Sequence, residues 1–124
     1  MKIVIAGSRC YSPKEADRLV EDAAHRFTDA EELVSGSCPS GIDQAGERWA
    51  KKYGIPIKRF PADWDRHGRA AGPIRNRQMA EYADYVIVIW DGKSRGAKNM
   101  MDLASEYDKP HIIIIPSLED RDDS

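Results

Sequence analysis

Three short runs of apolar residues constrain the fold of this chain most. They are Lys2–Ala6 (KIVIA), Tyr85–Trp90 (YVIVIW) and His111–Ile115 (HIIII). A strand with one solvated face alternates apolar and polar residues, whereas these runs are apolar at successive positions. They are also shorter than most helices. The runs therefore predict strands that are covered on both faces, as in a parallel sheet between helices.

Segments with helical periodicity separate the predicted strands. In the first such segment Ser12 is a candidate N-cap, Pro13 suits the first helical position and Glu15 completes a capping box. Apolar residues follow at helical spacing. Similar patterns and turn signals predict the remaining elements, which are helices over about 42–53, 73–83 and 97–107 and strands over Glu32–Ser35 and Ile57–Phe60.

The alternation of strands and helices predicts the fold class. We expect an α/β, Rossmann-like, doubly wound sheet of five mainly parallel strands with helices on both faces. A length of 124 residues suits one domain. We assign this domain to residues 1–117 and an acidic, flexible tail to residues 118–124. The stretch Pro61–Gly72 has no clear period and is predicted to be a long surface loop.

Charge and hydropathy exclude several classes of protein. Nineteen Lys and Arg residues against twenty-one Asp and Glu residues give a net charge of −2. This excludes a strongly basic protein whose affinity comes from neutralising phosphates, so we do not expect nucleic acid as a partner. No apolar run approaches the ~20 residues of a membrane span. No export signal is visible, and the two cysteines, Cys10 and Cys38, do not form a disulfide framework. We therefore expect a cytoplasmic protein with no membrane partner.

Small and polar residues follow four of the predicted strands, and parallel sheets bind ligands at that edge. Glycine allows the backbone to approach a ligand closely, and the N–H groups that begin a helix bind phosphate. The pattern predicts a nucleotide pocket, although each glycine taken alone is also explained by turn chemistry. The candidates are Gly7, Ser8, Arg9, Gly36, Ser37, Gly41, Asp43, Trp64, Asp91, Gly92 and Gly96, of which Trp64 would stack on a base.

Three arginines, Arg69, Arg75 and Arg77, cluster near the start of the helix predicted over 73–83. Arg75 is expected in its first turn, where a cation is unfavourable for the helix dipole. A bidentate phosphate or carboxylate partner would offset that cost. Asn76 is a further candidate for ligand binding. A solvated basic face, with Asn76 bonded to nearby backbone, is the alternative.

Standard phosphate and metal motifs are not matched. Gly92-Lys93-Ser94 resembles the end of a Walker loop, but Ile87 stands where that loop needs glycine, and no G-x-G-x-x-G follows the first strand. The spacing Asp63-x-Asp65-x-His67 is explained better by a solvated loop than by a metal site. We expect no metal and no cofactor, and the motifs support neither a P-loop ATPase nor an ordinary dinucleotide dehydrogenase.

Three motifs carry a resemblance to a known family. Ser35-Gly36 with Gly41-Ile42-Asp43, then Phe60–Trp64 (FPADW), then Ala71–Arg77 (AGPIRNR) resemble the SLOG superfamily, in particular its small single-domain YspA-type members. Smf/DprA and the Lonely Guy phosphoribohydrolases are relatives. The resemblance extends from Lys2 to Ile115. It implies a Rossmann-like sheet, a nucleotide-derived ligand such as an ADP-ribose relative or a nucleotide second messenger, and a homo-oligomer.

The resemblance also implies roles for single residues. Arg75 matches an arginine of the phosphoribohydrolase members, Gly92 and Gly96 match their phosphate loop, and Lys98 is a candidate phosphate contact. The hydrolases carry Pro-Gly-Gly-x-Gly-Thr-x-x-Glu in this stretch. Here Ala97 and Met100 stand at the threonine and glutamate positions, and a methionine cannot act as acid or base.

This departure favours one of two functions. We expect a protein that binds its nucleotide-derived ligand without turnover, as a sensor or a sequestering protein. The alternative is an N-glycosidase or phosphoribohydrolase that releases a base from a nucleoside monophosphate, with Asp43 or Asp91 in place of the missing glutamate. No catalytic residue is assigned. Single-strand DNA binding is a third hypothesis, which the acidic net charge disfavours.

Overall fold

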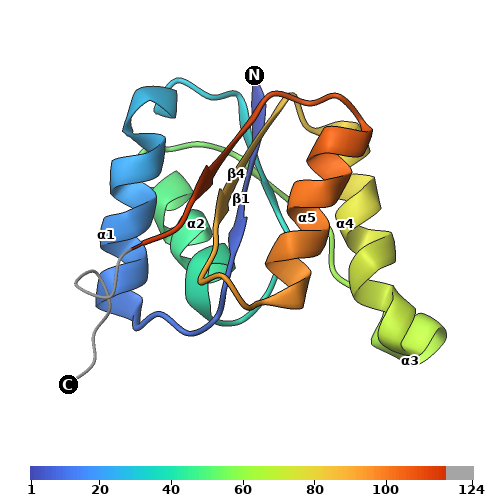
Figure 1. The fold of residues 1–124 in the computed structure, drawn as a ribbon. Coiled ribbons are helices and arrows are strands. Elements are labelled where there is room, and N and C mark those ends of the chain that lie inside the picture. The colour runs from blue at the N-terminus through green and yellow to red at the C-terminus, as the bar shows by residue number, and fades with distance from the viewer. Residues whose placement is uncertain (117–124) are drawn as a thin grey trace.

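A computed structural model describes residues 1–116 of the chain (Figure 1). The predicted acidic tail over 118–124 lies outside the described residues. The strands are β1 (Lys2–Gly7), β2 (Glu32–Ser35), β3 (Ile57–Arg59), β4 (Tyr85–Ile89) and β5 (His111–Ile114). The helices are α1 (Pro13–Ala24), α2 (Gly41–Lys52), α3 (Trp64–His67), α4 (Ala71–Tyr82) and α5 (Arg95–Glu106), with 3-10 turns η1 (His25–Phe27) and η2 (Gly68–Ala70).

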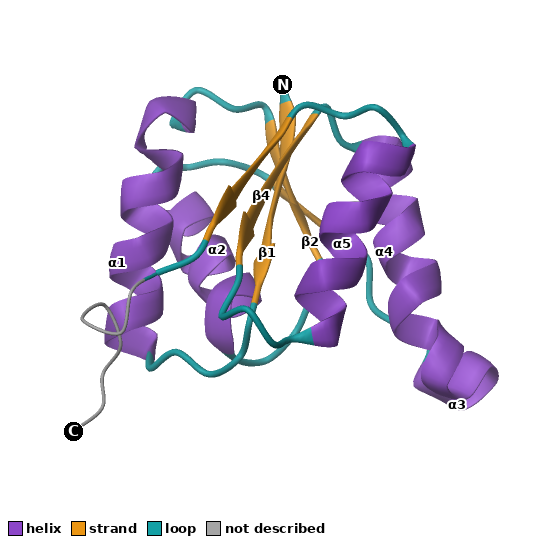
Figure 2. Ribbon diagram, in the orientation of Figure 1, coloured by secondary structure: helices purple, strands orange, loops and turns teal. Residues whose placement is uncertain are grey.

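The five strands form one parallel sheet in the order β3-β2-β1-β4-β5. Helices α1 and α2 cover one face, and α4 and α5 cover the other (Figure 2). The predicted Rossmann-like, doubly wound class is therefore confirmed. The chain runs outward from β1 to β3, then returns across the sheet through α4 to β4. The strand order thus reverses between β1 and β4, where such sheets bind ligands.

The two central strands divide their side chains between two cores. Ile3 and Ile5 of β1 point toward α1 and α2, whereas Val4 points toward α4 and α5. In β4, Ile87 lies on the first side and Val86 on the second. All of these side chains are buried, because helices cover both faces. This explains why the runs are apolar at every position rather than at alternate positions.

Two expectations about local structure were wrong. The stretch predicted as one long loop contains α3 and η2, because Asp63 caps α3 by accepting the backbone N–H of Arg66 at 3.2 Å. Helix α4 begins at Ala71, two residues earlier than predicted. Arg75 therefore lies in the second turn of α4 and not in the first, so the argument from an unfavourable dipole at a helix start does not apply to it.

The fifth strand is less covered than its sequence indicates. β5 pairs only with β4 and is an edge of the sheet, and Ile113 is 40% exposed. A run of isoleucines therefore does not distinguish a buried strand from an apolar edge strand. None of the helices within residues 1–116 is long and apolar enough to cross a membrane.

Gly7 ends β1 where three elements meet. A Cβ added there would lie 2.2 Å from the carbonyl oxygen of Ile89 and 2.9 Å from the side chain of Ile42. We predict that Gly7→Ala lowers the free energy of unfolding by about 3 kcal/mol, because backbone and core must shift. Gly96→Ala is the control, since a Cβ on Gly96 meets nothing within 4 Å. It should leave stability unchanged or raise it by about 0.5 kcal/mol. Urea unfolding measures both, and equal stabilities of the two variants would contradict the packing argument.

Candidate functional site

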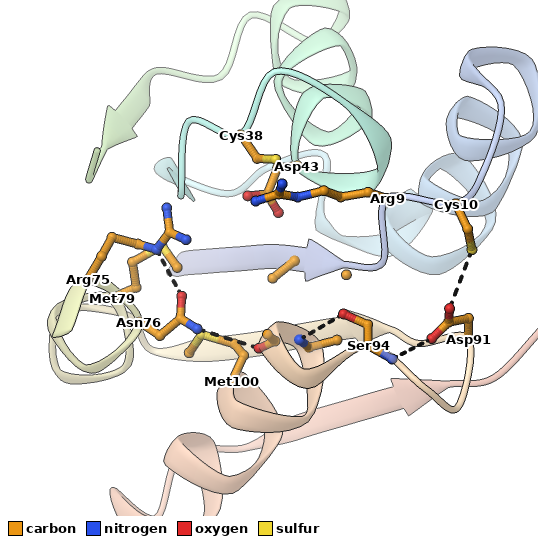
Figure 3. A pocket seen from close by; sticks show the side chains of 14 residues that line it. Arg9, Cys10, Cys38, Asp43, Arg75, Asn76, Met79, Asp91, Ser94 and Met100 are labelled. Carbon is orange, nitrogen blue, oxygen red and sulfur yellow. Dashed lines mark hydrogen bonds between the residues drawn. The ribbon is translucent and has the colours of Figure 1, made fainter. Parts of the chain in front are cut away.

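A cavity of about 390 Å³ opens at the carboxyl edge of the sheet, where the strand order reverses between β1 and β4 (Figure 3). Its walls come from segments far apart in the sequence. From β1 and the residues after it come Ala6, Gly7, Arg9 and Cys10; from the β2–α2 region, Cys38 and Asp43; from α4, Arg75, Asn76 and Met79; and from β4 onward, Asp91, Ser94, Gly96, Ala97 and Met100.

Arg75 is held in place by neighbours on both sides. Its Nε donates to Oδ1 of Asn76 at 2.9 Å, and its Nη1 donates to the carbonyl oxygen of Gly36. Asn76 is buried, and its Nδ2 donates to Oδ1 of Asn99 at 2.9 Å. This series of hydrogen bonds connects the loop after β2 to α4 and α5. The guanidinium is thus oriented before any ligand arrives, which reduces the entropy lost on binding.

Asp43 lies in the first turn of α2 and faces the cavity. Burial raises the pKa of its carboxyl group from 3.8 to about 6, although the nearby guanidinium groups of Arg75 and Arg9 and the backbone N–H of Cys38 act in the opposite direction. A Cβ added to Gly36 would lie 2.8 Å from Asp43 Oδ2 and 2.8 Å from Arg75 Nη1. Because Gly36 has no side chain, the carboxyl group of Asp43 and the guanidinium group of Arg75 can both lie beside it.

Asp91 organises the loop that leads into α5. Its Oδ1 accepts the backbone N–H groups of Lys93 and Ser94, both at 2.8 Å, and its Oδ2 accepts from Cys10 Sγ at 3.6 Å. Burial alone would raise the pKa of Asp91, but the N–H groups of Ser94 and Lys93 outweigh it and keep this pKa below its ordinary value. Asp91 therefore stays ionised at neutral pH and is engaged in holding the loop.

The arrangement is suited to binding an anion with an apolar body. Two guanidinium groups, from Arg9 and Arg75, share the cavity with the first turn of α5 at Gly96 and Ala97. Helix N-termini carry positive potential and exposed N–H groups. Met79 and Met100 are both buried and supply an apolar wall. The cavity thus combines groups that can bind an anion with an apolar surface.

The cavity brings together half of the residues singled out from the sequence. Those that line it are Gly7, Arg9, Asp43, Arg75, Asn76, Asp91 and Gly96. Ser8, Gly36 and Gly41 do not line the cavity but contact residues that do. Ser8 Oγ accepts the backbone N–H of Asp91 at 3.0 Å, and an added Cβ on Gly41 would lie 2.6 Å from Arg9 Cα. Close packing and hydrogen bonding account for their places in the fold, and a role for them in ligand binding stays a prediction.

Four other candidates do not line this cavity. Trp64 is 54% exposed on α3, and Lys98 forms an ion pair with Asp102 at 2.6 Å on the outer side of α5. Gly92 has nothing within 4 Å of an added Cβ. Ser37 has a φ of 60° and donates its backbone N–H to Ser35 Oγ at 3.1 Å. The Oγ of Ser37 is buried and has no hydrogen-bond partner among residues 1–116. A role in ligand binding stays a prediction for all four residues.

Sequence reasoning missed several lining residues. Cys10 and Cys38 both follow strand ends, which is the signal that could have found them, but a cysteine pair points first to disulfide or thiolate chemistry. Ser94 is the N-cap of α5, and its Oγ accepts the backbone N–H of Ala97 at 3.4 Å. Met79 fits the pattern of a core residue, and no sequence signal shows that it also contacts the cavity.

Comparison with known proteins identifies the family. Residues 1–67, more than half of the chain, match the model of the YspA, cpYpsA-related SLOG family. The chain belongs to this family. Membership implies a nucleotide-related ligand in general terms and confirms the resemblance noted in the sequence. Gene 61 protein of Mycobacterium phage D29 is 29% identical over 119 residues, which cover 90% of this chain and 94% of that protein.

Two solved structures share the fold. DNA processing protein A (DprA) from Streptococcus pneumoniae superposes with a TM-score of 0.77 at 23% identity, over 98% of this chain and 53% of that chain. The chain thus spans about half the length of DprA. The molybdenum cofactor binding protein from Rippkaea orientalis superposes with a TM-score of 0.69 at 19% identity, over 96% of this chain and 78% of that chain. At these identities the two likenesses show the fold alone.

The raised pKa of Asp43 gives a prediction for stability. The unfolded chain releases this proton near pH 3.8 and the folded protein near pH 6, so Asp43 lowers stability progressively as pH rises through that window. We predict that Asp43→Asn is more stable than wild type at pH 7.5 by about 1–2 kcal/mol, with the difference vanishing near pH 4. Urea unfolding across this range measures it. A variant less stable than wild type at pH 7.5 would show that the arginines outweigh burial.

Proposed function

We propose that this protein binds a nucleotide or nucleotide-derived small molecule in the cavity between β1 and β4. The ligand class is that of ADP-ribose relatives or nucleotide second messengers. The protein holds this ligand without turnover, as a sensor or a sequestering protein. The observation that carries the proposal is the fixed guanidinium of Arg75 on a cavity that Arg9 also lines.

Electrostatics support an anionic ligand. Arg75 and Arg9 both line the cavity, and so do the carboxyl groups of Asp43 and Asp91. Asp91 is engaged by the N–H groups of Lys93 and Ser94, and burial raises the pKa of Asp43 to about 6, so a proton taken up near neutral pH removes its charge. A phosphate would accept hydrogen bonds from the guanidinium groups and from the backbone N–H of Gly96, whereas that of Ala97 donates to Ser94 Oγ. A volume of about 390 Å³ falls within the range of small-molecule pockets. When ionised, Asp43 can accept hydrogen bonds from the hydroxyl groups of a ribose.

The groups near the ligand favour binding over turnover. Met100 lines the cavity and is 1% exposed, and its thioether carries no proton to transfer. Asp91 accepts three hydrogen bonds from its own loop and from Cys10. Neither residue therefore offers a proton near neutral pH, since these hydrogen bonds keep the pKa of Asp91 low, and this supports binding without turnover.

One observation favours the second candidate, an N-glycosidase or phosphoribohydrolase. A carboxyl group with a pKa of about 6 exchanges its proton close to neutral pH, as a general acid or base does. Asp43 has this property and faces the cavity. In that mechanism Asp43 stabilises positive charge on the ribose, or protonates the leaving base, while Arg75 holds the phosphate.

Cytoplasmic location and a homo-oligomeric state are part of the same proposal. Apolar side chains support the second point, since Trp64 on α3 is 54% exposed and Ile113 on β5 is 40% exposed. Sedimentation velocity at micromolar concentration tests it directly. A single species of 14.0 kDa would contradict the homo-oligomer.

A ligand screen with product analysis tests the function. The protein is incubated with AMP, ADP, ADP-ribose, NAD, cyclic ADP-ribose isomers and cyclic dinucleotides, its melting temperature is followed, and the mixtures are then separated by chromatography. A ligand present at 100 times its dissociation constant stabilises the protein by about 2.7 kcal/mol. We expect a shift with the ligand recovered intact. Release of free base that is lost in Asp43→Asn would establish the enzyme instead, and no shift with any compound would contradict both functions.

Arg75 provides the sharpest variant. We predict that Arg75→Ala weakens binding of the active compound by tenfold or more, because a charge-assisted, bidentate contact is lost. Arg77→Ala is the matched control. It removes the same charge from the same helix, but Arg77 faces Glu106 at 3.5 Å and does not line the cavity. Calorimetric titration of both variants, with circular dichroism to confirm folding, measures the difference. Equal losses in the two variants would show that only net charge matters.

A further inference from the structure

A second cavity, of about 200 Å³, adjoins Arg75. Arg66 and His67 of α3 line one side of it, and Ile74, Arg75 and Gln78 of α4 line the other. Arg75 is thus shared by this cavity and by the cavity at the sheet edge. The shape of this region depends on α3 and on the early start of α4, which were not expected from the sequence.

Arg75 has donors left for a ligand. Its Nε bonds to Asn76 and its Nη1 bonds to the carbonyl oxygen of Gly36. A guanidinium group carries five N–H donors in a planar fork, so three remain beyond these two bonds. These donors can serve a group in either cavity, or two linked groups that lie on the two sides of Arg75.

The charges on the second cavity favour an anion. Arg66 and Arg75 both line it, so two positive charges stand against the single carboxylate of Asp63. The carboxylate of Asp63 also lines this cavity, and its Oδ1 accepts the backbone N–H of Arg66. Within residues 1–116, no ion pair joins Asp63 to either arginine. His67 and Gln78 add further hydrogen-bonding groups.

We propose that this second cavity is a subsite for a second phosphoryl group of the ligand. The ligand is then a nucleoside diphosphate or a derivative of one, with Arg75 between its two phosphates and Arg66 on the outer phosphate. This inference rests on the proposed function, and it narrows the ligand class to compounds with a diphosphate.

Calorimetric titration with AMP, ADP and ADP-ribose tests the subsite. Wild type should bind ADP and ADP-ribose at least tenfold more tightly than AMP, because only the diphosphates reach Arg66. Arg66→Ala should reduce this preference to about threefold or less while leaving the affinity for AMP unchanged. Arg69→Ala is the matched control, since Arg69 is an exposed arginine on the adjoining turn η2 and lines neither cavity. It should keep the wild-type preference.

The outcomes separate the two proposals. AMP binding as tightly as the diphosphates, or Arg66→Ala weakening all three compounds equally, would overturn the subsite and leave nucleotide binding intact. A loss of preference in Arg69→Ala equal to that in Arg66→Ala would also overturn it, because long-range charge would then explain the effect. If none of the three compounds binds and the wider screen is also negative, the proposed function itself fails.

Discussion

The close approach of β1 to β4 and α2 at Gly7 and Ser8 is the constraint on which the rest of the structure depends. The backbone N–H of Ser8 donates to the carbonyl oxygen of Ile89 at 3.0 Å, and the carbonyl oxygen of Ser8 accepts from the N–H of Ile42 at 3.3 Å. The end of β1 is thereby bonded both to the end of β4 and to the start of α2. Only glycine fits at position 7, because any Cβ would overlap the backbone of β4. These contacts fix the ends of β1 and β4, between which the cavity opens.

Hydrogen bonds between α4, the loop after β2 and α5 hold the walls of the cavity together. Arg75 reaches from α4 to the carbonyl oxygen of Gly36, and Asn76 continues the connection to Asn99 on α5. Asp43 lies beside this bridge, and burial raises its pKa to about 6. The result is a site in which the Arg75 guanidinium is oriented in advance and the carboxyl group of Asp43 changes its charge close to neutral pH. Under the proposed function, such a site discriminates between ligands by the placement of their phosphates.

The sequence predicted the sheet because short, continuous apolar runs between helical segments are typical of strands buried on both faces. It predicted half of the cavity lining because residues after parallel strands share one edge. It did not predict the exposure of Ile113, since an edge strand and a central strand of isoleucines look alike. It also missed α3, whose helix cap at Asp63 becomes clear only from the backbone geometry. Met79 contacts the cavity through the packing of α4, which no local pattern encodes.

A crystal structure of the protein with ADP-ribose would test the central claim most directly. The account predicts phosphate oxygens within hydrogen-bond distance of Arg75 at the carboxyl ends of β1 and β4, with the Arg75 side chain still bonded to Asn76. Density for the ligand in the groove between α1 and α2 beside Trp49 would contradict it. So would a complex in which Arg75 makes no contact with the ligand.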